Sequence, residues 1–228
     1  MFHFNYFCKE KLTYVKKSLQ KIMILKKPLD HIFATWSNIA VLRVLSSVKT
    51  PLSGREIAKL SGMSAPSALQ SLSSLESLNL IIRNRGGREH FFSLNRENYF
   101  IKKVIIPVIT SEKKFPEEIF REIKYNLQDF VLSAILFGST ARGEEEVQSD
   151  FDLCIVYQGQ TNRKRIEYAI PKLREILHQK YGVSLAPFLI TKKEFYSKAK
   201  NKLSPVSNII KDGKILFGNS INDLINGS

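Results

Sequence analysis

Cysteine, tryptophan and long apolar runs are all scarce in this 228-residue sequence. The two cysteines, Cys8 and Cys154, lie far apart in the chain, which excludes a disulfide framework and indicates a reducing, cytoplasmic setting. No run approaches the roughly 18 apolar residues of a membrane span, so we expect no membrane partner. The four histidines have no metal-ligand spacing and predict no metal site of their own.

Acidic residues are scarce in the first half of the chain only. Residues 1–110 hold 17 Lys and Arg against 6 Asp and Glu, whereas residues 111–228 hold 18 against 15. The presence of any single lysine is explained by the need to keep the protein surface soluble. A strongly basic half beside a nearly balanced half predicts a polyanionic partner for the basic half.

The most informative stretch is Leu136–Gly143 (LFGSTARG). The apolar run at 131–137 that leads into it predicts a strand buried on both faces. Gly138 lets the backbone approach a ligand closely, and Ser139 adds a hydroxyl donor. The residues up to Arg142 can begin a helix whose free N–H groups favour an anion.

A second part of the same pattern is Ser149–Leu153 (SDFDL). Residues i and i+2 of a strand share a face, so Asp150 and Asp152 point together while Phe151 points into the core. Two adjacent carboxylates repel each other unless a cation lies between them. Oxygen ligands of this kind suit Mg²⁺, which also takes ligands from substrate phosphates. Together the two stretches predict a site for a Mg-bound nucleoside triphosphate.

This compound pattern resembles the signature of the minimal nucleotidyltransferases of the DNA polymerase beta superfamily. It consists of Gly138-Ser139, ten intervening residues that include Arg142-Gly143 and Ser149, and then Asp150-x-Asp152. The resemblance implies catalytic and metal-binding roles for Asp150 and Asp152. It also implies nucleotide-binding roles for Gly138, Ser139 and Arg142, with Mg²⁺ and a nucleoside triphosphate, which we expect to be ATP, as cofactors.

The resemblance further implies a third acidic residue on a later strand. The matching run, 183–190, contains no Asp or Glu. Glu194 lies beyond it, and Thr191-Lys-Lys-Glu194 is better explained as a helix capping box. A site that transfers nucleotide and a site that only binds it therefore both remain open.

The basic half follows a helix, turn, helix, hairpin order over residues 30–95. An amphipathic helix is predicted from Asp30 to Ser46, and a Ser53–Glu56 capping box opens a short second helix. Leucines recur at helical spacing over 64–78 and form a core stripe. Two apolar strands around Gly86-Gly87 then predict a hairpin.

This order resembles a winged helix-turn-helix domain with 64–78 in the recognition-helix position. The candidate DNA contacts share small or basic side chains on that helix and on the wing: Ser64, Ser67, Gln70, Ser71, Arg83, Arg85 and Arg88. Gln70 can pair with adenine in a major groove, and arginines suit phosphates or a narrow minor groove. Because winged helices also serve in protein docking and dimerisation, DNA and a homodimer are both candidate partners.

The expected fold class is α+β. We predict a basic extension at 1–29, the winged helix at 30–96, a helical linker at 97–130, a nucleotidyltransferase domain with a small mixed sheet flanked by helices at 131–220, and a tail at 221–228. The extension, with Lys9, Lys11, Lys16, Lys17 and Lys21, is either a basic arm or upstream sequence before a start at Met23. Pro116 is expected to begin a helix, and Pro171 to kink another or mark its start.

About residues 24–218 resemble a group of prokaryotic proteins that fuse these two domains. Three functions follow. The first is transfer of a nucleoside monophosphate to a hydroxyl of a protein, a nucleic acid or a small molecule. The second is DNA-binding regulation with a nucleotide-sensing or inactive second domain. The third is an antitoxin-like module that pairs with a toxin-like helical partner.

Overall fold

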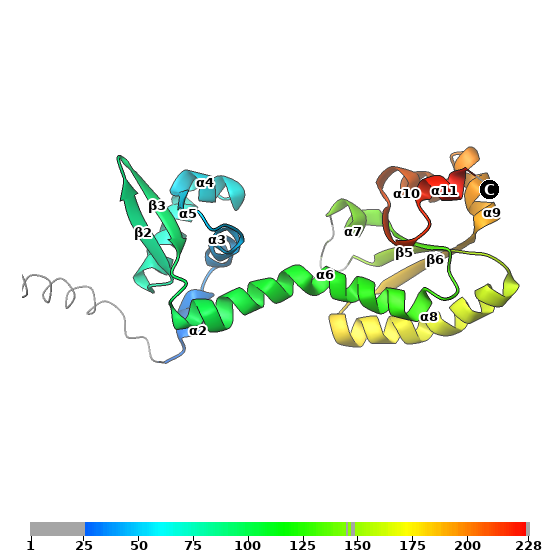
Figure 1. Cartoon of the computed structure of the whole chain (residues 1–228), viewed down its shortest axis with the longest axis horizontal. Helices are drawn as coiled ribbons and strands as arrows, with labels where there is room; N and C mark the ends of the chain where they lie inside the picture. The colour runs from blue at the N-terminus through cyan, green and yellow to red at the C-terminus, as the bar shows by residue number, and fades with distance from the viewer. Residues whose placement is uncertain (1–25, 145, 147–148, 227–228) are drawn as a thin grey trace, which may run out of the picture. The chain divides into compact units, whose positions relative to one another are not determined.

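The computed structural model describes residues 26–144, 146 and 149–226. The chain divides into two compact units, Met1–Lys113 and Lys114–Ser228 (Figure 1). The predicted basic extension lies almost entirely outside the described residues. Each unit has its own buried core, and each is described here by itself.

The N-terminal unit contains a helix-turn-helix followed by a hairpin. Its elements are α2 (Pro28–Ile32), α3 (Trp36–Ser47), β1 (Leu52–Ser53), α4 (Gly54–Leu60), α5 (Ala65–Ser77), β2 (Ile81–Gly86) and β3 (Glu89–Leu94). The three strands pair antiparallel in the order β1-β3-β2, with β2 and β3 joined at Gly86-Gly87. This is the winged helix-turn-helix architecture that the sequence predicts.

Local capping chemistry fixes where the helices of this unit begin. The Ser53 side chain accepts from the Glu56 amide while Glu56 accepts from the Ser53 amide, which confirms the predicted capping box. Ser64 caps α5 in a similar way by accepting from the Ser67 amide. Leu72 and Leu75 of α5 are fully buried against apolar side chains of α3, α4 and the hairpin.

The helix predicted from Asp30 to Ser46 is wrong in its first part. The chain instead forms the short α2 and then a new helix, α3, which begins at Trp36. Thr35 has an extended backbone, and its side chain accepts a hydrogen bond from the Asn38 amide. Thr35 is therefore the N-cap at which a separate helix, α3, begins. Asn38 stays buried by donating to the carbonyls of residues 31 and 32.

A long helical segment follows the hairpin. It begins with a π-helical turn, η1 (Ile101–Ile105), and continues as α6 (Ile106–Leu127), inside which the two units divide. The prediction that Pro116 begins a helix is wrong, because Pro116 lies in the interior of α6. A proline there removes one backbone hydrogen bond, but Ile109 and Ile119 on either side are buried in the core of their own units.

The C-terminal unit is a four-stranded sheet with helices on both faces. The remaining elements are β4 (Ser133–Leu136), α7 (Gly138–Arg142), β5 (Phe151–Tyr157), α8 (Gln160–Tyr181), β6 (Leu185–Thr191), α9 (Lys192–Lys200), α10 (Val206–Asp212), β7 (Lys214–Gly218) and α11 (Ile221–Ile225). The strand order is β6-β5-β4-β7. Only β5 and β6 pair parallel, so the sheet is mixed, as predicted.

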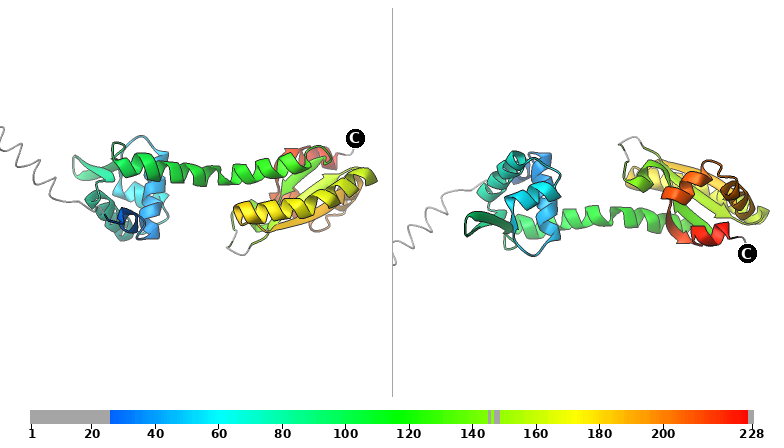
Figure 2. Two further views of the ribbon diagram at one scale, coloured as in Figure 1. Left: turned by 90° about the horizontal axis from the view of Figure 1, so that it is seen from below. Right: turned by 90° about the horizontal axis from the view of Figure 1, so that it is seen from above.

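Two apolar layers enclose this sheet. Residues of α6 and α8 pack on one face, with Phe151, Leu153 and Ile155 of β5 beneath them. Residues of α9, α10 and α11 pack on the other face, against Cys154 and Val156. The two views of Figure 2, from below and from above, show these helix layers on opposite sides of the sheet.

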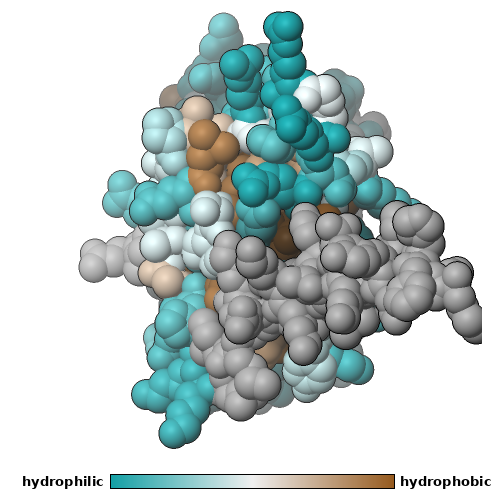
Figure 3. Space-filling model, turned by 90° about the vertical axis from the view of Figure 1, so that its left-hand side faces the viewer, coloured by the Kyte–Doolittle hydropathy of each residue, from teal (hydrophilic) through white to brown (hydrophobic). Residues whose placement is uncertain are grey.

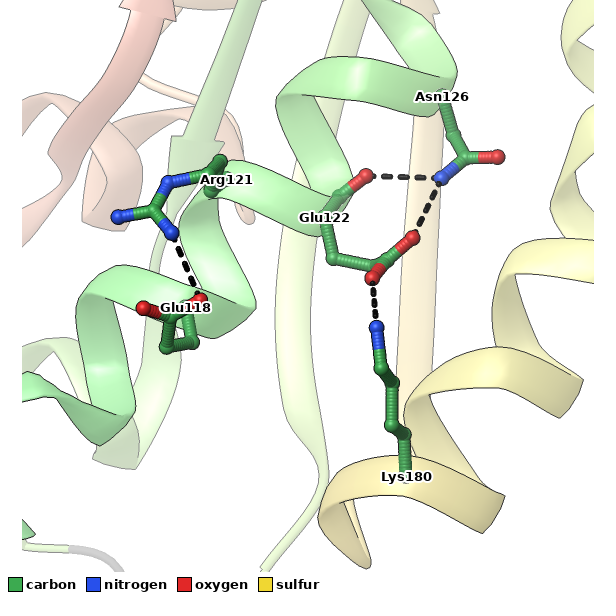
Figure 4. A network of polar contacts seen from close by, with 5 residues as sticks. All are labelled: Glu118, Arg121, Glu122, Asn126 and Lys180. Atoms are coloured by element: carbon green, nitrogen blue, oxygen red, sulfur yellow. Dashed lines mark hydrogen bonds and ion pairs between the residues drawn. The ribbon is translucent and has the colours of Figure 1, made fainter. Parts of the chain in front are cut away.

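Polar contacts hold α6 against α8 at the edge of the first layer (Figure 4). Lys180 Nζ lies 2.8 Å from Glu122 Oε2, and Asn126 Nδ2 donates to the Glu122 carbonyl at 2.9 Å. The interpretation of Pro171 as the start of α8 is wrong, because the helix runs unbroken from Gln160. Ile166 and Ile170 before the proline and Leu173 and Leu177 after it are all buried.

None of the helices formed by the described residues has the length and apolar character needed to cross a bilayer.

Candidate active site and DNA interface

The two aspartates lie at the amino end of β5. Asp152 lies within the strand and is half-buried. Asp150 is exposed and lies one residue before the first residue of the strand. The odd-numbered residues of β5 belong to the core beneath α6 and α8, whereas Cys154 and Val156 belong to the opposite core. Strand alternation therefore places Asp152 on the side away from α8. Asp150 precedes the strand and lines a hollow together with Arg174 and His178 of α8.

The turn between β4 and α7 rests against these two acids. Gly138 has a φ of +75°, and a β-carbon at this position would overlap the Asp152 carboxylate. The Phe137 amide donates to the Asp152 carbonyl at 3.0 Å, and Thr140 Oγ1 donates to the Asp150 carbonyl at 3.5 Å. Ser139 follows Gly138 and is half-exposed. The structure thus brings Gly138, Ser139 and both aspartates together.

The electrostatics of the pair favour a bound cation. Burial, and then the negative charge of Asp150, raise the pKa of Asp152. A divalent cation between the two carboxylates would relieve both causes. Mg²⁺ characteristically binds proteins through one or two carboxylates and completes its shell with water and phosphate oxygens. The acid pair and the glycine beside it therefore fit a magnesium–phosphate group.

The third acid implied by the family resemblance is missing at the position where the sheet would place it. In the parallel β5–β6 pairing, Asp152 lies opposite Ala186. The Phe151 amide donates to the Ser184 carbonyl at 2.7 Å, which fixes this register. No cluster of three or more His, Cys, Asp or Glu with metal-binding geometry exists among the described residues. The site therefore has two acidic side chains, with a methyl group opposite Asp152 on the neighbouring strand.

Arg142 has a partner that the sequence pattern did not indicate. Its Nε donates to Glu144 at 2.7 Å, and this contact raises the pKa of Arg142. The negative charge of Asp212, at the end of α10, contributes to the same rise in pKa. The positive charge of Arg142 is therefore partly compensated within the protein. Sequence reasoning missed several neighbours of the site that belong to neither the glycine–serine nor the Asp-x-Asp motif, namely Thr140, Asp212, and Arg174 and His178 beside Asp150.

The candidate DNA-contacting residues of α5 divide into exposed and buried ones. Gln70 and Ser64 are exposed and Ser67 is half-exposed. Ser71 is only 3% exposed and donates to Ser37 Oγ at 2.8 Å inside the unit. Ser71 therefore holds α5 against α3 and is unavailable to a groove, which corrects its place among the predicted contacts.

The wing arginines are all exposed, but they differ in their contacts. Arg83 Nε lies 3.1 Å from Glu76 Oε1 of α5. Within the described part of the chain, Arg85 and Arg88 make no ion pair. The upper part of the face in Figure 3, where the hairpin tip lies in Figure 1, is covered by hydrophilic side chains.

Comparisons with known proteins agree with this geometry in the C-terminal unit. Residues 116–216 match the family model described as a nucleotidyltransferase domain. A protein of Methanocaldococcus jannaschii with the provisional name of a protein adenylyltransferase is 29% identical over 104 residues, which are 44% of this chain and 68% of that protein.

Solved structures also resemble the chain, at a lower level. The homodimeric winged helix-turn-helix DNA-binding domain of a possible ArsR-family regulator from Mycobacterium bovis is 16% identical, with a TM-score of 0.31 over 52% of this chain and 95% of that one. The adhesin competence repressor of Streptococcus pyogenes is 15% identical, with a TM-score of 0.33 over 52% and 81%. TM-scores this low do not support a fold assignment. The N-terminal unit is assigned as a winged helix-turn-helix domain from its own order of helices and strands. The chain joins a winged helix-turn-helix domain to a nucleotidyltransferase domain.

Proposed function

We propose that this protein transfers a nucleoside monophosphate from a Mg-bound nucleoside triphosphate, ATP in the simplest case, to a hydroxyl group of an acceptor. In this reaction the acceptor oxygen forms a bond to the α-phosphorus, and the bond from that phosphorus to the bridging oxygen of pyrophosphate breaks. The nucleotidyltransferase domain and the name of the archaeal relative support this general chemistry. The observation that carries the proposal is the Asp150–Asp152 pair against Gly138.

Each residue has a part that its position supports. Asp150 and Asp152 would hold Mg²⁺, which when bound polarises the phosphates and neutralises the charge that develops on them. Ser139 and the backbone beside Gly138 would bind the phosphate oxygens, since this glycine turn lies directly against the Asp152 carboxylate. Arg142, partly compensated by Glu144, would offset the remaining phosphate charge.

The proton of the acceptor hydroxyl has no carboxylate to take it at position 186, where β6 faces Asp152. A positioned general base contributes about 10²–10⁴-fold in rate. We therefore expect slow transfer, which positioning and the metal site alone would support.

The experiment is incubation with each of the four nucleoside triphosphates labelled at the α-phosphate, with and without cell extract. Transfer of label to protein, nucleic acid or a small molecule that disappears in Asp152→Ala supports the proposal. If none of the four nucleotides yields transferred label in any fraction, the transferase proposal fails.

A second function is favoured by a specific observation, the methyl group of Ala186 in place of an acid. It is a DNA-binding regulator in which the C-terminal domain senses nucleotide without transferring it. The exposed Gln70, Arg85 and Arg88 would contact the duplex. This function predicts salt-dependent duplex binding that Asp150→Ala leaves unchanged, together with nucleotide binding in the absence of label transfer.

A further inference from the structure

A hollow of about 320 Å³ lies beside Asp150 in the C-terminal unit. Residues 183–186, at the start of β6, form one side of it, and Arg174 and His178 of α8 form another. Asp150, which precedes β5, also lines it. The volume is at the lower end of the range of about 300–1,000 Å³ that is typical of small-molecule sites.

Asp150 connects this hollow with the acid pair. Its negative charge raises the pKa of Asp152, so the two carboxylates lie close enough to interact. Ala186, which the parallel pairing places opposite Asp152, lines the same hollow. An acceptor hydroxyl that enters the hollow therefore comes beside the acids that we propose as Mg²⁺ ligands.

The part of α8 that forms a wall of the hollow is held in place. Arg174 Nε donates to the Leu185 carbonyl at 3.1 Å, which ties α8 to β6. Leu173 and Leu177, in the same two turns of α8, are fully buried against the sheet. His178 lies four residues after Arg174, one turn further along the same face of the helix. The backbone of His178 is therefore fixed beside the hollow.

The imidazole ring of His178 is available for chemistry. His178 is exposed, and its ring makes no hydrogen bond or ion pair with any other residue that the structure describes. The unprotonated nitrogen of a neutral imidazole accepts a proton, and histidine is the side chain most often used as a general base. Asp150 also lines the hollow, but its carboxylate has the role of metal ligand in the proposed reaction.

We propose that the acceptor hydroxyl binds in this hollow and that His178 is the catalytic residue that takes its proton. The inference rests on the proposed transfer reaction and supplies, from α8, the base that β6 lacks at position 186. The O–H bond breaks as the acceptor oxygen bonds to the α-phosphorus, and the proton moves to an imidazole nitrogen of His178. Pyrophosphate leaves with the electron pair of the broken P–O bond, and the imidazolium then releases its proton to solvent.

The structure also limits how much His178 contributes. An effective general base is held in one orientation by a third group, and no described residue orients this ring. We therefore expect His178 to contribute about tenfold, less than the roughly 10²–10⁴-fold of a positioned base. This contribution agrees with the slow transfer expected of the site.

The test is the rate of label transfer from ATP labelled at the α-phosphate to the acceptor in cell extract. The full-length protein is used at saturating Mg–ATP, and the rate with Asp152→Ala is subtracted as background. His178→Ala and His178→Gln should both transfer label about tenfold more slowly than the wild type. Free imidazole should restore part of the rate of His178→Ala, because it can occupy the space of the deleted ring, but none of the rate of Asp152→Ala. The thermal shift produced by Mg–ATP should be normal in both His178 variants, because His178 contacts the acceptor and not the nucleotide.

His31→Ala is the matched control, because His31 is an exposed histidine on α2 of the other unit, and it should transfer label at the wild-type rate. The inference is overturned if His178→Ala is as fast as His31→Ala, or if imidazole leaves the rate of His178→Ala unchanged. It is also overturned if the His178 variants lose the thermal shift with Mg–ATP, which would make His178 a nucleotide contact. If the wild type transfers no label, the transfer proposal fails and this inference fails with it. Transfer by the wild type together with a normal rate in His178→Ala removes this inference alone.

Discussion

The α-carbon of Gly138 lies so close to the carboxylate of Asp152 that a β-carbon there would overlap Oδ2. This contact makes the glycine of the turn and the second aspartate of the Asp-x-Asp pair parts of one site. A nucleotide phosphate that approaches the turn necessarily approaches the carboxylate that we propose as a metal ligand.

Replacing Gly138 with alanine should displace Asp152 and abolish binding of the Mg–nucleotide complex. The substitution also strains the backbone at φ +75°, at a cost on the order of 1–3 kcal/mol of folding free energy. Gly143→Ala is the matched control, because its φ is +72° but no atom lies within 4 Å of the added methyl. We expect similar strain but normal nucleotide binding in Gly143→Ala, measured by calorimetry. If both variants bound the nucleotide equally well, the contact between Gly138 and Asp152 would not be part of the nucleotide site.

Asp152→Asn should stabilise the metal-free protein at neutral pH. The pKa of Asp152 is raised in the folded state, so the folded protein favours the protonated form. The corresponding stability is fully present below the unfolded-state pKa and is lost as pH rises through the folded-state pKa. The melting temperature of Asp152→Asn in EDTA should exceed that of the wild type by on the order of 1–2 °C near pH 7, with a smaller gain near pH 4. If the rise in melting temperature were the same at both pH values, it would come from altered packing and not from loss of the Asp152 charge.

Ala186→Asp should increase transfer if the acid pair is catalytic. The new carboxylate would face Asp152 across the β5–β6 pairing and could take the proton of the acceptor hydroxyl. A general base contributes about 10²–10⁴-fold, and we expect at least tenfold from an unoptimised one. Ala186→Asn has nearly the same shape without the charge and should remain at the wild-type rate. The same rate in both variants would show that a base at this position is not what limits the reaction.

The wing arginines should contribute unequally to DNA binding. Arg85→Ala and Arg88→Ala should each lower the slope of log affinity against log salt by about 0.9, the effect of losing one phosphate contact. Arg83→Ala should have a smaller effect because Glu76 already pairs with Arg83, and Glu76→Gln should strengthen binding by releasing it. Fluorescence anisotropy with a labelled duplex measures all four variants. Equal losses at Arg83 and Arg85 would contradict the role given to Glu76.

The sequence predicted the architecture where local chemistry and periodicity agree. The Ser53 and Thr191 capping boxes are both confirmed, because a cap depends only on residues three apart. The alternation predicted for the strand is confirmed by the split of β5 between two cores, whereas the shared face of Asp150 and Asp152 stays a prediction because Asp150 precedes the strand. Cys154 of β5 is fully buried, and this burial raises the pKa of its thiol to about 12.

What failed depended on contacts between distant residues. Local sequence predicts that Pro116 begins a helix and that Pro171 either kinks one or marks its start, but buried residues on both sides of each proline continue the helix. Ser71 lies on the polar side of its helical pattern, and only its hydrogen bond to Ser37 reveals that it is buried. The Arg142–Glu144 and Arg83–Glu76 pairs likewise depend on side-chain geometry that residue spacing does not determine.

The most direct measurement is the thermal shift produced by ATP, GTP, CTP and UTP with Mg²⁺, on the wild type and on Asp150→Ala. At a ligand concentration of about 100 times Kd, binding stabilises a protein by about 2.7 kcal/mol, which corresponds to several degrees for a chain of this size. We expect at least one nucleotide to raise the melting temperature of the wild type in a Mg²⁺-dependent way, and Asp150→Ala to lose that rise. An equal rise in both proteins, or none with any nucleotide, would contradict a metal–triphosphate site at the acid pair.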